Sequence, residues 1–193
     1  MLPLRNHQNA YGLVSILLHW LVALAVIGLF VLGLWMVDLT YYSSWYKTAP
    51  FWHKSIGIIL AAALFARLLW RLGNPQPKPP SNHKPWEIRL AHLTHFMLYS
   101  LLFGIVISGY LISTAKGQGI SVFDWFEVPA LITDLPQQAD SAGKIHYWLA
   151  LALMGLITLH VSGALKHHFI DRDPTLTRML KPGPTKTKEN LNE

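Results

Sequence analysis

Four long apolar stretches divide the chain and predict four membrane-spanning helices. The first runs from Tyr11 to Val37 and the last lies between Lys144 and Lys166, and neither has an Asp, Glu, Lys or Arg in its interior. A helix needs about 20 apolar residues to cross the hydrocarbon core of a bilayer. We therefore expect one compact domain, residues 11–168, with helices at about 11–37, 51–72, 88–115 and 144–168.

The segments between these stretches have the composition of loops. Residues 38–50 are turn-rich and aromatic, residues 73–86 are rich in proline, and residues 116–143 contain several acids. Polar residues 1–10 precede the first stretch, and a polar tail, residues 169–193, follows the last. The first stretch is too long for the apolar core of a secretory signal peptide and has no small-residue cleavage site, so we expect it to remain as a helix.

The amino-acid composition agrees with a membrane protein and excludes several kinds of metal site. Hydrophobic residues make up 52% of the chain and charged residues only 13%, whereas soluble domains carry about 25% charged residues. The eight Trp and seven Tyr suit belts at the membrane interfaces. The chain has no Cys, which excludes disulfides, Cys-bound zinc or iron–sulfur clusters, and covalently attached c-type haem. The sequence predicts an all-α integral membrane protein, a four-helix bundle.

The distribution of basic residues predicts the orientation in the membrane. With the N-terminus in the cytoplasm, 12 Lys and Arg residues fall on the inner side and four on the outer side. Basic residues are concentrated in cytoplasmic loops, so we expect both termini to be cytoplasmic. The pI of about 9.6 follows from this asymmetry, and we expect membrane lipid, not nucleic acid, as a partner.

Histidines occur at matching depths in these helices. His146 and His160 are 14 residues apart, which places both on one side of a helix and about 21 Å apart along its axis. With alternating helix directions, His19 lies at the depth of His160 near the inner side, and His53 lies at the depth of His146 near the outer side. Ionisable residues in a spanning helix are costly and mark functional sites, although a single His also serves as a polar contact between helices.

Two imidazoles that face each other across a bundle can bind one metal axially. Haem iron suits such a site because the macrocycle supplies the four equatorial nitrogens. Zinc would need further His or carboxylate ligands, and the helix interiors contain no carboxylate at these depths. The pattern therefore favours two bis-histidine b-type haems, an inner one on His19 and His160 and an outer one on His53 and His146, held in the core of the bundle.

Two glycines share positions with these histidines. Gly57 lies four residues after His53 on the same helix face. Gly33 lies 14 residues after His19, at the depth of the outer pair. Either glycine can make room for a flat macrocycle or can serve ordinary close packing of membrane helices.

Five sequence segments contain these histidines or other polar residues. They are Leu18-His19-Trp20, Trp52-His53-Lys54-Ser55-Ile56-Gly57, Arg67-Leu68-Leu69-Trp70-Arg71, Ala91-His92-Leu93-Thr94-His95, and Ile145-His146 with Leu159-His160 and Lys166-His167-His168. These segments resemble the bacterial cytochrome b561 family. The aromatic segment 38–50 and the segments 109–114 and 121–126 resemble the YceJ-like subgroup of that family. The resemblance covers about residues 11–180. It implies a four-helix protein of the bacterial inner membrane with two haem b groups that exchanges electrons with quinone. Some relatives oxidise periplasmic superoxide and reduce ubiquinone, and subgroup relatives are often associated with a periplasmic polyisoprenoid-binding protein.

Other polar residues lie near the expected haems. Arg67 follows His53 by 14 residues, which places it at the depth of the inner pair. There it is a candidate partner for a haem propionate, or an interfacial arginine that reaches the headgroups. His95 and His167, near the inner end, are candidates for hydrogen bonds to a propionate or to an axial ligand. The same kind of role at the outer haem falls to Lys54.

The favoured function is electron transfer between a quinone or quinol pool and a periplasmic donor or acceptor, which makes the protein an oxidoreductase with ubiquinone as a candidate substrate. The alternative is a haem-bearing membrane anchor subunit of a larger redox complex. A metal transporter is disfavoured because the helix interiors have almost no ionisable residues to line a path. The outer loops carry five acids against four bases, which favours a docked protein or quinol over superoxide as the donor.

Overall fold

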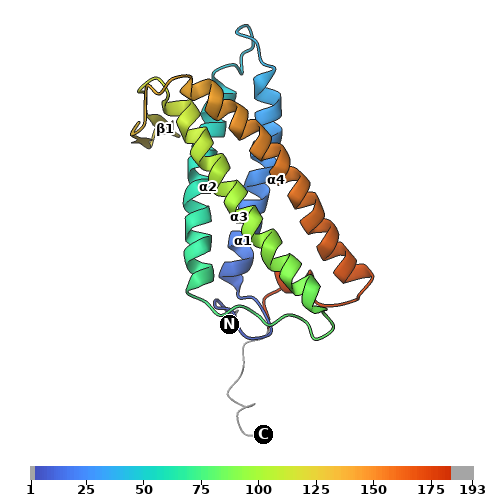
Figure 1. Ribbon diagram of the computed structural model, residues 1–193. Helices are drawn as coiled ribbons and strands as arrows, with labels where there is room; N and C mark the ends of the chain where they lie inside the picture. Colours follow the sequence, from blue (N-terminus) through green and yellow to red (C-terminus); the bar gives the residue numbers. More distant parts are fainter. Residues whose placement is uncertain (1–2, 184–193) are drawn as a thin grey trace.

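The computed structural model describes residues 3–183 and contains four long helices that run the length of the molecule (Figure 1). They are α1 (Leu13–Val37), α2 (Thr48–Leu72), α3 (Pro85–Thr114) and α4 (Gln138–Phe169). Each is long and apolar enough to cross a membrane. The expected all-α, four-helix membrane fold is confirmed.

Three helices begin earlier than the apolar stretches suggested, because helical hydrogen bonding continues into the polar interface. α3 starts at Pro85, where proline is favoured, and the Lys84 amide donates to Glu87 Oε2 at 2.9 Å. α4 starts at Gln138, whose side-chain Oε1 accepts a hydrogen bond from the Leu135 amide at 3.2 Å. Hydropathy marks the apolar length of a helix, whereas hydrogen bonds of polar residues beside its ends contribute to where it begins.

The helices form two antiparallel pairs. α1 packs along α2, and α3 packs along α4, while α2 also contacts α3. The backbone of α4 has few close approaches to α1 and α2, the helices that carry His19 and His53. The bundle therefore consists of two helical hairpins.

The described chain begins and ends at the same end of the bundle, where the proline-rich segment also lies (Figure 1). We call this the inner end, and the opposite end the outer end, in keeping with the expected orientation. The Lys78 amide donates to the Gln8 carbonyl at 2.7 Å, and Trp20 Nε1 donates to the Met179 carbonyl at 2.7 Å. The chain on both sides of the helices is thus folded against the inner end as far as the structure describes it.

A short β-hairpin covers part of the outer end. β1 (Ile120–Val122) pairs antiparallel with β2 (Phe126–Val128), and the turn between them has positive φ at Phe123 and Asp124. Ser55 Oγ accepts a hydrogen bond from the Phe123 amide at 3.1 Å. The segment expected to be a plain loop is therefore fixed to α2 close to His53.

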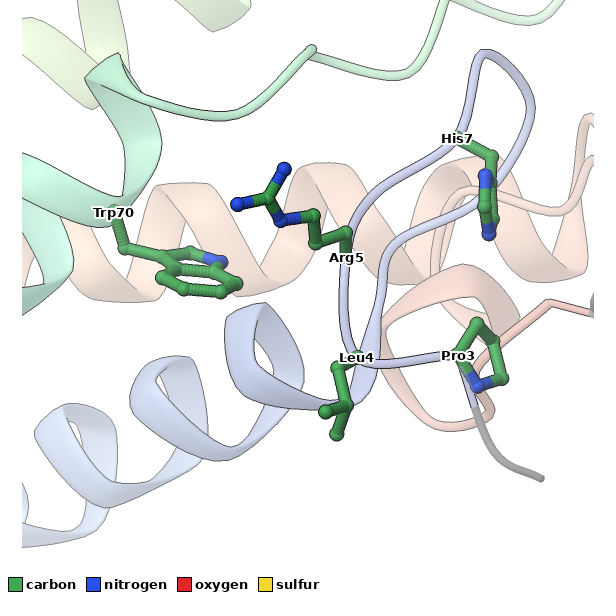
Figure 2. A pocket seen from close by; sticks show the side chains of 5 residues that line it. All are labelled: Pro3, Leu4, Arg5, His7 and Trp70. Atoms are coloured by element: carbon green, nitrogen blue, oxygen red, sulfur yellow. The ribbon is translucent and has the colours of Figure 1, made fainter.

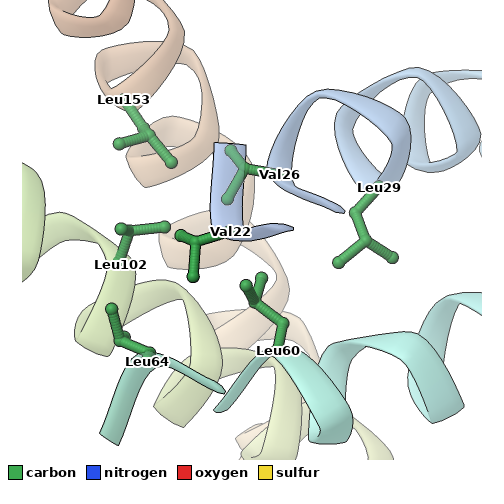
Figure 3. Close-up of a cluster of buried hydrophobic side chains, with 7 residues drawn as sticks. All are labelled: Val22, Val26, Leu29, Leu60, Leu64, Leu102 and Leu153. Carbon is green, nitrogen blue, oxygen red and sulfur yellow. The ribbon is translucent and has the colours of Figure 1, made fainter. Parts of the chain in front are cut away.

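A small apolar core fills the middle of the bundle (Figure 3). It consists of Val22, Val26, Leu29, Leu60, Leu64, Leu102 and Leu153. Along α1, α2 and α4 these residues lie between the inner and outer histidine positions. Many other large apolar side chains are exposed on the outside of the helices, as expected where lipid covers the surface. This core separates the two ends of the bundle with a layer of hydrocarbon.

Candidate metal centres

The structure brings four histidines together as two pairs at opposite ends of the apolar core. The rings of His19 (α1) and His160 (α4) have centroids 6.4 Å apart and planes inclined by 66°. The rings of His53 (α2) and His146 (α4) have centroids 6.2 Å apart and planes inclined by 67°. We call these the inner pair and the outer pair. α4 contributes to both, because its 14-residue spacing keeps both rings on one face.

These distances suit two imidazoles that ligate one metal from opposite sides. A ligating nitrogen lies about 2.0–2.1 Å from the metal and about 1 Å from its own ring centre, so two trans rings have centres about 6 Å apart. In the described part of the chain, the groups of three or more clustered ligand atoms include none of these four histidines. Each pair therefore offers two ligands only, which fits a metal whose other ligands come from a macrocycle.

The outer pair is bordered by glycines and by one set of hydrogen bonds. A Cβ on Gly33 would lie 3.3 Å from His53 Cε1, and a Cβ on Gly109 would lie 3.2 Å from His146 Cε1. His146 Nδ1 lies 3.0 Å from the Ile105 carbonyl oxygen. A carbonyl oxygen only accepts, so the proton resides on Nδ1 and Nε2 keeps its lone pair for a metal.

His53 differs from His146 in its surroundings. Its Nδ1 is buried and has no hydrogen-bond partner within the described residues. A Cβ on Gly57, one turn along α2, would meet no atom within 4 Å. There is therefore room for a side chain at Gly57, whereas Gly33 lies close to the ring of His53. Lys54, the next residue, is exposed.

The inner pair lies among other polar side chains. Arg67 Nη2 is 2.8 Å from His19 Nδ1, and its guanidinium carbon lies 5.8 Å from the ring centroid of Tyr99. The ring of His95 is 5.3 Å from that of His160. The structure therefore brings Arg67 and His95 to the inner pair.

Tyr99 is a site residue that sequence reasoning missed. Its hydroxyl is buried, makes no hydrogen bond of good geometry among residues 3–183 and lies near the guanidinium of Arg67. A buried hydroxyl that is poorly paired is costly, so a polar group of a cofactor could bind there. The available signal was its position four residues after His95, on the same face of α3.

His167 lies in a polar cluster at the inner surface. Its ring stacks on His83, with centroids 4.3 Å apart, and its Nδ1 is 2.8 Å from Asp171 Oδ2 and 3.1 Å from Asp173 Oδ2. Burial would raise the pKa of Asp173, but hydrogen bonds from Thr175 and His83 and the nearby His167 outweigh it and lower that pKa to about 2. His167 is thus engaged with the chain after α4.

Two clefts on the surface are lined by residues other than the four paired histidines. The larger, about 460 Å³, is lined by Pro3, Leu4, Arg5, His7 and Trp70, with the Arg5 side chain extending toward Trp70 (Figure 2). A second, about 340 Å³, lies on the outer part of α4. Neither contains a histidine of the inner or outer pair, so the candidate metal centres are defined by facing side chains in the bundle.

Comparisons with known proteins agree with this arrangement. The family model of prokaryotic cytochrome b561 matches residues 10–182. "Cytochrome b561 homolog 2" of Escherichia coli (strain K12) is 53% identical over 175 residues, which are 91% of this chain and 93% of that protein. "Probable superoxide oxidase CybB" of Yersinia pestis is 29% identical over 182 residues, 90% of this chain and 97% of that protein.

"Cytochrome b561 homolog 1" of Escherichia coli (strain K12) is also 29% identical, over 186 residues that make up 90% of this chain and 98% of that protein. The family resemblance of the sequence motifs is thereby confirmed, and with it the expectation of an electron-transfer protein of the bacterial membrane whose family implies b-type haem. The chain belongs to the prokaryotic cytochrome b561 family.

Proposed function

We propose that the protein carries electrons across the membrane on two b-type haems, between a quinone or quinol pool and a donor or acceptor at the outer end. His19 and His160 hold the inner haem, and His53 and His146 hold the outer haem. The observation that carries this proposal is the geometry of the two histidine pairs, with ring centroids 6.4 and 6.2 Å apart. Each iron, when bound, takes up and releases one electron at a time.

The protein supplies position, insulation and charge around these centres. The apolar core between the pairs excludes water and ions from the middle of the bundle. Arg67 and Tyr99 offer hydrogen-bond donors at the inner pair, where they suit the carboxylates of a haem. The excess of basic residues at the inner end supports a cytoplasmic location for both termini.

We place quinone exchange at the inner end. Quinone reduction consumes protons as well as electrons, and the inner pair has His95 beside it, a residue suited to proton transfer. The outer pair has fewer groups that could transfer protons. His146 contacts the Ser108 hydroxyl and the Ile105 carbonyl, and Nδ1 of His53 has no hydrogen-bond partner within the described residues. This asymmetry favours a quinone at the inner end and an electron donor at the outer end.

The donor is proposed to be a docked periplasmic protein or a quinol. One relative carries the name superoxide oxidase, so superoxide is the competing donor. Superoxide is an anion, and fast capture benefits from a positive approach surface. Here the outer loops carry five acids against four bases, although Lys54 and Lys144 lie close to the outer pair in sequence.

A spectrum and a rapid-mixing experiment test this function. The purified protein is expected to contain two haems per chain, seen in a reduced-minus-oxidised spectrum and a haem assay. In stopped-flow measurements, quinol should reduce the haems readily, whereas reduction by superoxide should be slower than diffusion and depend little on salt. A superoxide rate near the diffusion limit that falls steeply with salt would identify superoxide as the donor, and absence of haem would refute the proposal.

Substitution of Gly33 tests whether the bundle leaves room for the outer haem. A Cβ at this position would lie 3.3 Å from His53 Cε1, so Gly33→Ala should displace the ring and reduce outer-haem content several-fold. Gly28→Ala on the same helix is the matched control, because its Cβ would meet nothing within 4 Å. The measurement is haem per chain; equal haem content in the two variants would show that the contact has no role.

A further inference from the structure

The hydroxyl of Ser108 lies deep in the bundle and contacts His146 and the carbonyl to which His146 also bonds. It lies on α3 and is only 4% exposed. Its Oγ is 3.0 Å from the Ile105 carbonyl oxygen and 3.1 Å from His146 Nδ1. His146 Nδ1 is itself 3.0 Å from the same carbonyl oxygen. The three groups therefore form a triangle between α3 and α4.

Only one arrangement of protons satisfies this triangle. The Ile105 carbonyl oxygen can only accept, so the Ser108 hydroxyl donates to it, and so does Nδ1–H of His146. The lone pairs of Ser108 Oγ are then free to accept from the same Nδ1–H. The contact of Nδ1 with the carbonyl oxygen requires the proton on Nδ1, and the contact with Ser108 Oγ is compatible with it. Nε2 of His146 is left as the nitrogen available to a metal.

The neighbouring glycine makes this approach of the two helices compatible with the ring. A Cβ on Gly109 would lie 3.2 Å from Cε1 and 3.4 Å from Nδ1 of His146, which is closer than most side chains tolerate. Ser108 and Gly109 are adjacent residues of α3 that contact the imidazole of His146 on α4. Ser108 bonds its Nδ1, and Gly109 leaves room for the ring. The partner ring, His53, has no hydrogen bond at Nδ1 within the described residues.

The inner pair has the opposite electrostatic surroundings. Arg67 places a cationic donor 2.8 Å from His19 Nδ1. A fixed positive charge beside a haem favours the ferrous state, which carries one positive charge less. A hydrogen bond from Nδ1–H to an oxygen does the reverse, because it makes the ligand more basic and stabilises the ferric state.

We propose that Ser108 is a positioning residue for the outer haem: together with the Ile105 carbonyl it holds the proton on His146 Nδ1 and lowers the midpoint potential of that haem below that of the inner haem. The inference rests on the proposed ligation by His53 and His146. Its consequence is a direction of flow, since electrons pass spontaneously from the haem of lower potential to that of higher potential. Electrons that enter at the outer end therefore move inward.

The variants Ser108→Thr and Ser108→Val test the hydroxyl separately from side-chain volume, because Thr and Val have nearly the same shape and only Thr has a hydroxyl. Thr keeps a hydroxyl that can bond the carbonyl one turn back, and Val removes it. In Val the reduction equilibrium of the outer haem should shift about threefold to tenfold toward the ferrous state, a rise of about 30–60 mV for one electron. In Thr the shift should be largely absent, and the inner haem should be unchanged in both.

The measurement is a redox titration of the holoprotein followed by haem absorption, with the ferric low-spin EPR signals as a second readout. Ser113→Ala is the matched control, because within residues 3–183 the hydrogen bond of Ser113 Oγ is donated to the Gly109 carbonyl of its own helix, at 3.0 Å. Loss of the outer haem in Val but not in Thr would also support the role of the hydroxyl.

Three results would overturn the inference. They are equal shifts in Thr and Val, no shift in Val, and an outer-haem potential at or above the inner one in the unmodified protein. Failure of the proposed function is distinguishable, because His146→Ala would then leave both haems in place. If His146→Ala removes the outer haem and Ser108→Val changes nothing, only the inference about Ser108 fails.

Discussion

Replacement of either histidine of the outer pair by alanine is expected to abolish normal ligation of the outer haem and to leave the inner haem intact. The ring centroids of His53 and His146 lie 6.2 Å apart, and with one ring missing a haem bound between them would have only one histidine ligand. The haem should then be lost or become high-spin, which absorption and EPR spectra detect. His19→Ala and His160→Ala should produce the same change in the inner haem only.

The assignment of histidines to pairs also predicts which haem each variant affects. If both rings of a pair ligate one iron, as proposed, the two variants of that pair must affect the same haem. His92→Ala is the matched control, since His92 is exposed and lies one turn from His95 on the same helix. Different losses in His53→Ala and His146→Ala, or loss of a haem in His92→Ala, would show that the assigned pairs are wrong.

Replacement of Arg67 by leucine is expected to lower the midpoint potential of the inner haem by roughly 60 mV, a tenfold change in its reduction equilibrium, and to weaken its retention. Arg67 lies at His19 Nδ1 and over the ring of Tyr99. Removal of its charge takes away an interaction that favours the ferrous state. The outer haem, at the other end of the apolar core, should change little.

The contact between Arg67 and His19 also indicates what happens when haem is bound. A guanidinium only donates, so Nδ1 of His19 accepts in this contact. A histidine that ligates iron through Nε2 carries its proton on Nδ1 and cannot accept there. With haem bound in this way, Arg67 would need another acceptor, and a haem propionate would suit it, since guanidinium binds carboxylates through two parallel hydrogen bonds.

A redox titration that resolves the two haems tests this role of Arg67. Arg71→Leu is the matched control, because Arg71 lies one turn further toward the inner surface. If Arg67→Leu moves neither potential and the protein still contains two haems per chain, Arg67 serves orientation in the membrane only. A change confined to the outer haem would contradict the assigned depth.

The sequence alone determined the class of protein and the positions of its histidines along the helices. Hydropathy identifies spans of about 20 residues whatever their neighbours are, and a 14-residue spacing fixes the relative direction of His146 and His160 because helical geometry is local. The depth of Arg67 followed from the same spacing after His53. The resemblance of the motifs then identified the family.

The tertiary structure decided what surrounds each histidine. Whether Ser108 or Gly109 meets His146 depends on how α3 is rotated about its own axis against α4, and a helix that is apolar on all sides carries no signal of that rotation. The same holds for Tyr99, which the sequence analysis did not single out. These contacts arise from packing between helices that are distant in the chain.

The ends of the bundle were likewise decided by tertiary contacts. The hairpin of β1 and β2 is fixed by the hydrogen bond of Ser55 to Phe123, and the chain after α4 is fixed by Asp173 and by the Met179 carbonyl. Polar loop residues satisfy their hydrogen bonds equally well with water, so composition does not predict these partners. The spans follow from hydrophobicity, which acts residue by residue, whereas the coverage of both ends depends on pairs of groups that only the folded chain brings together.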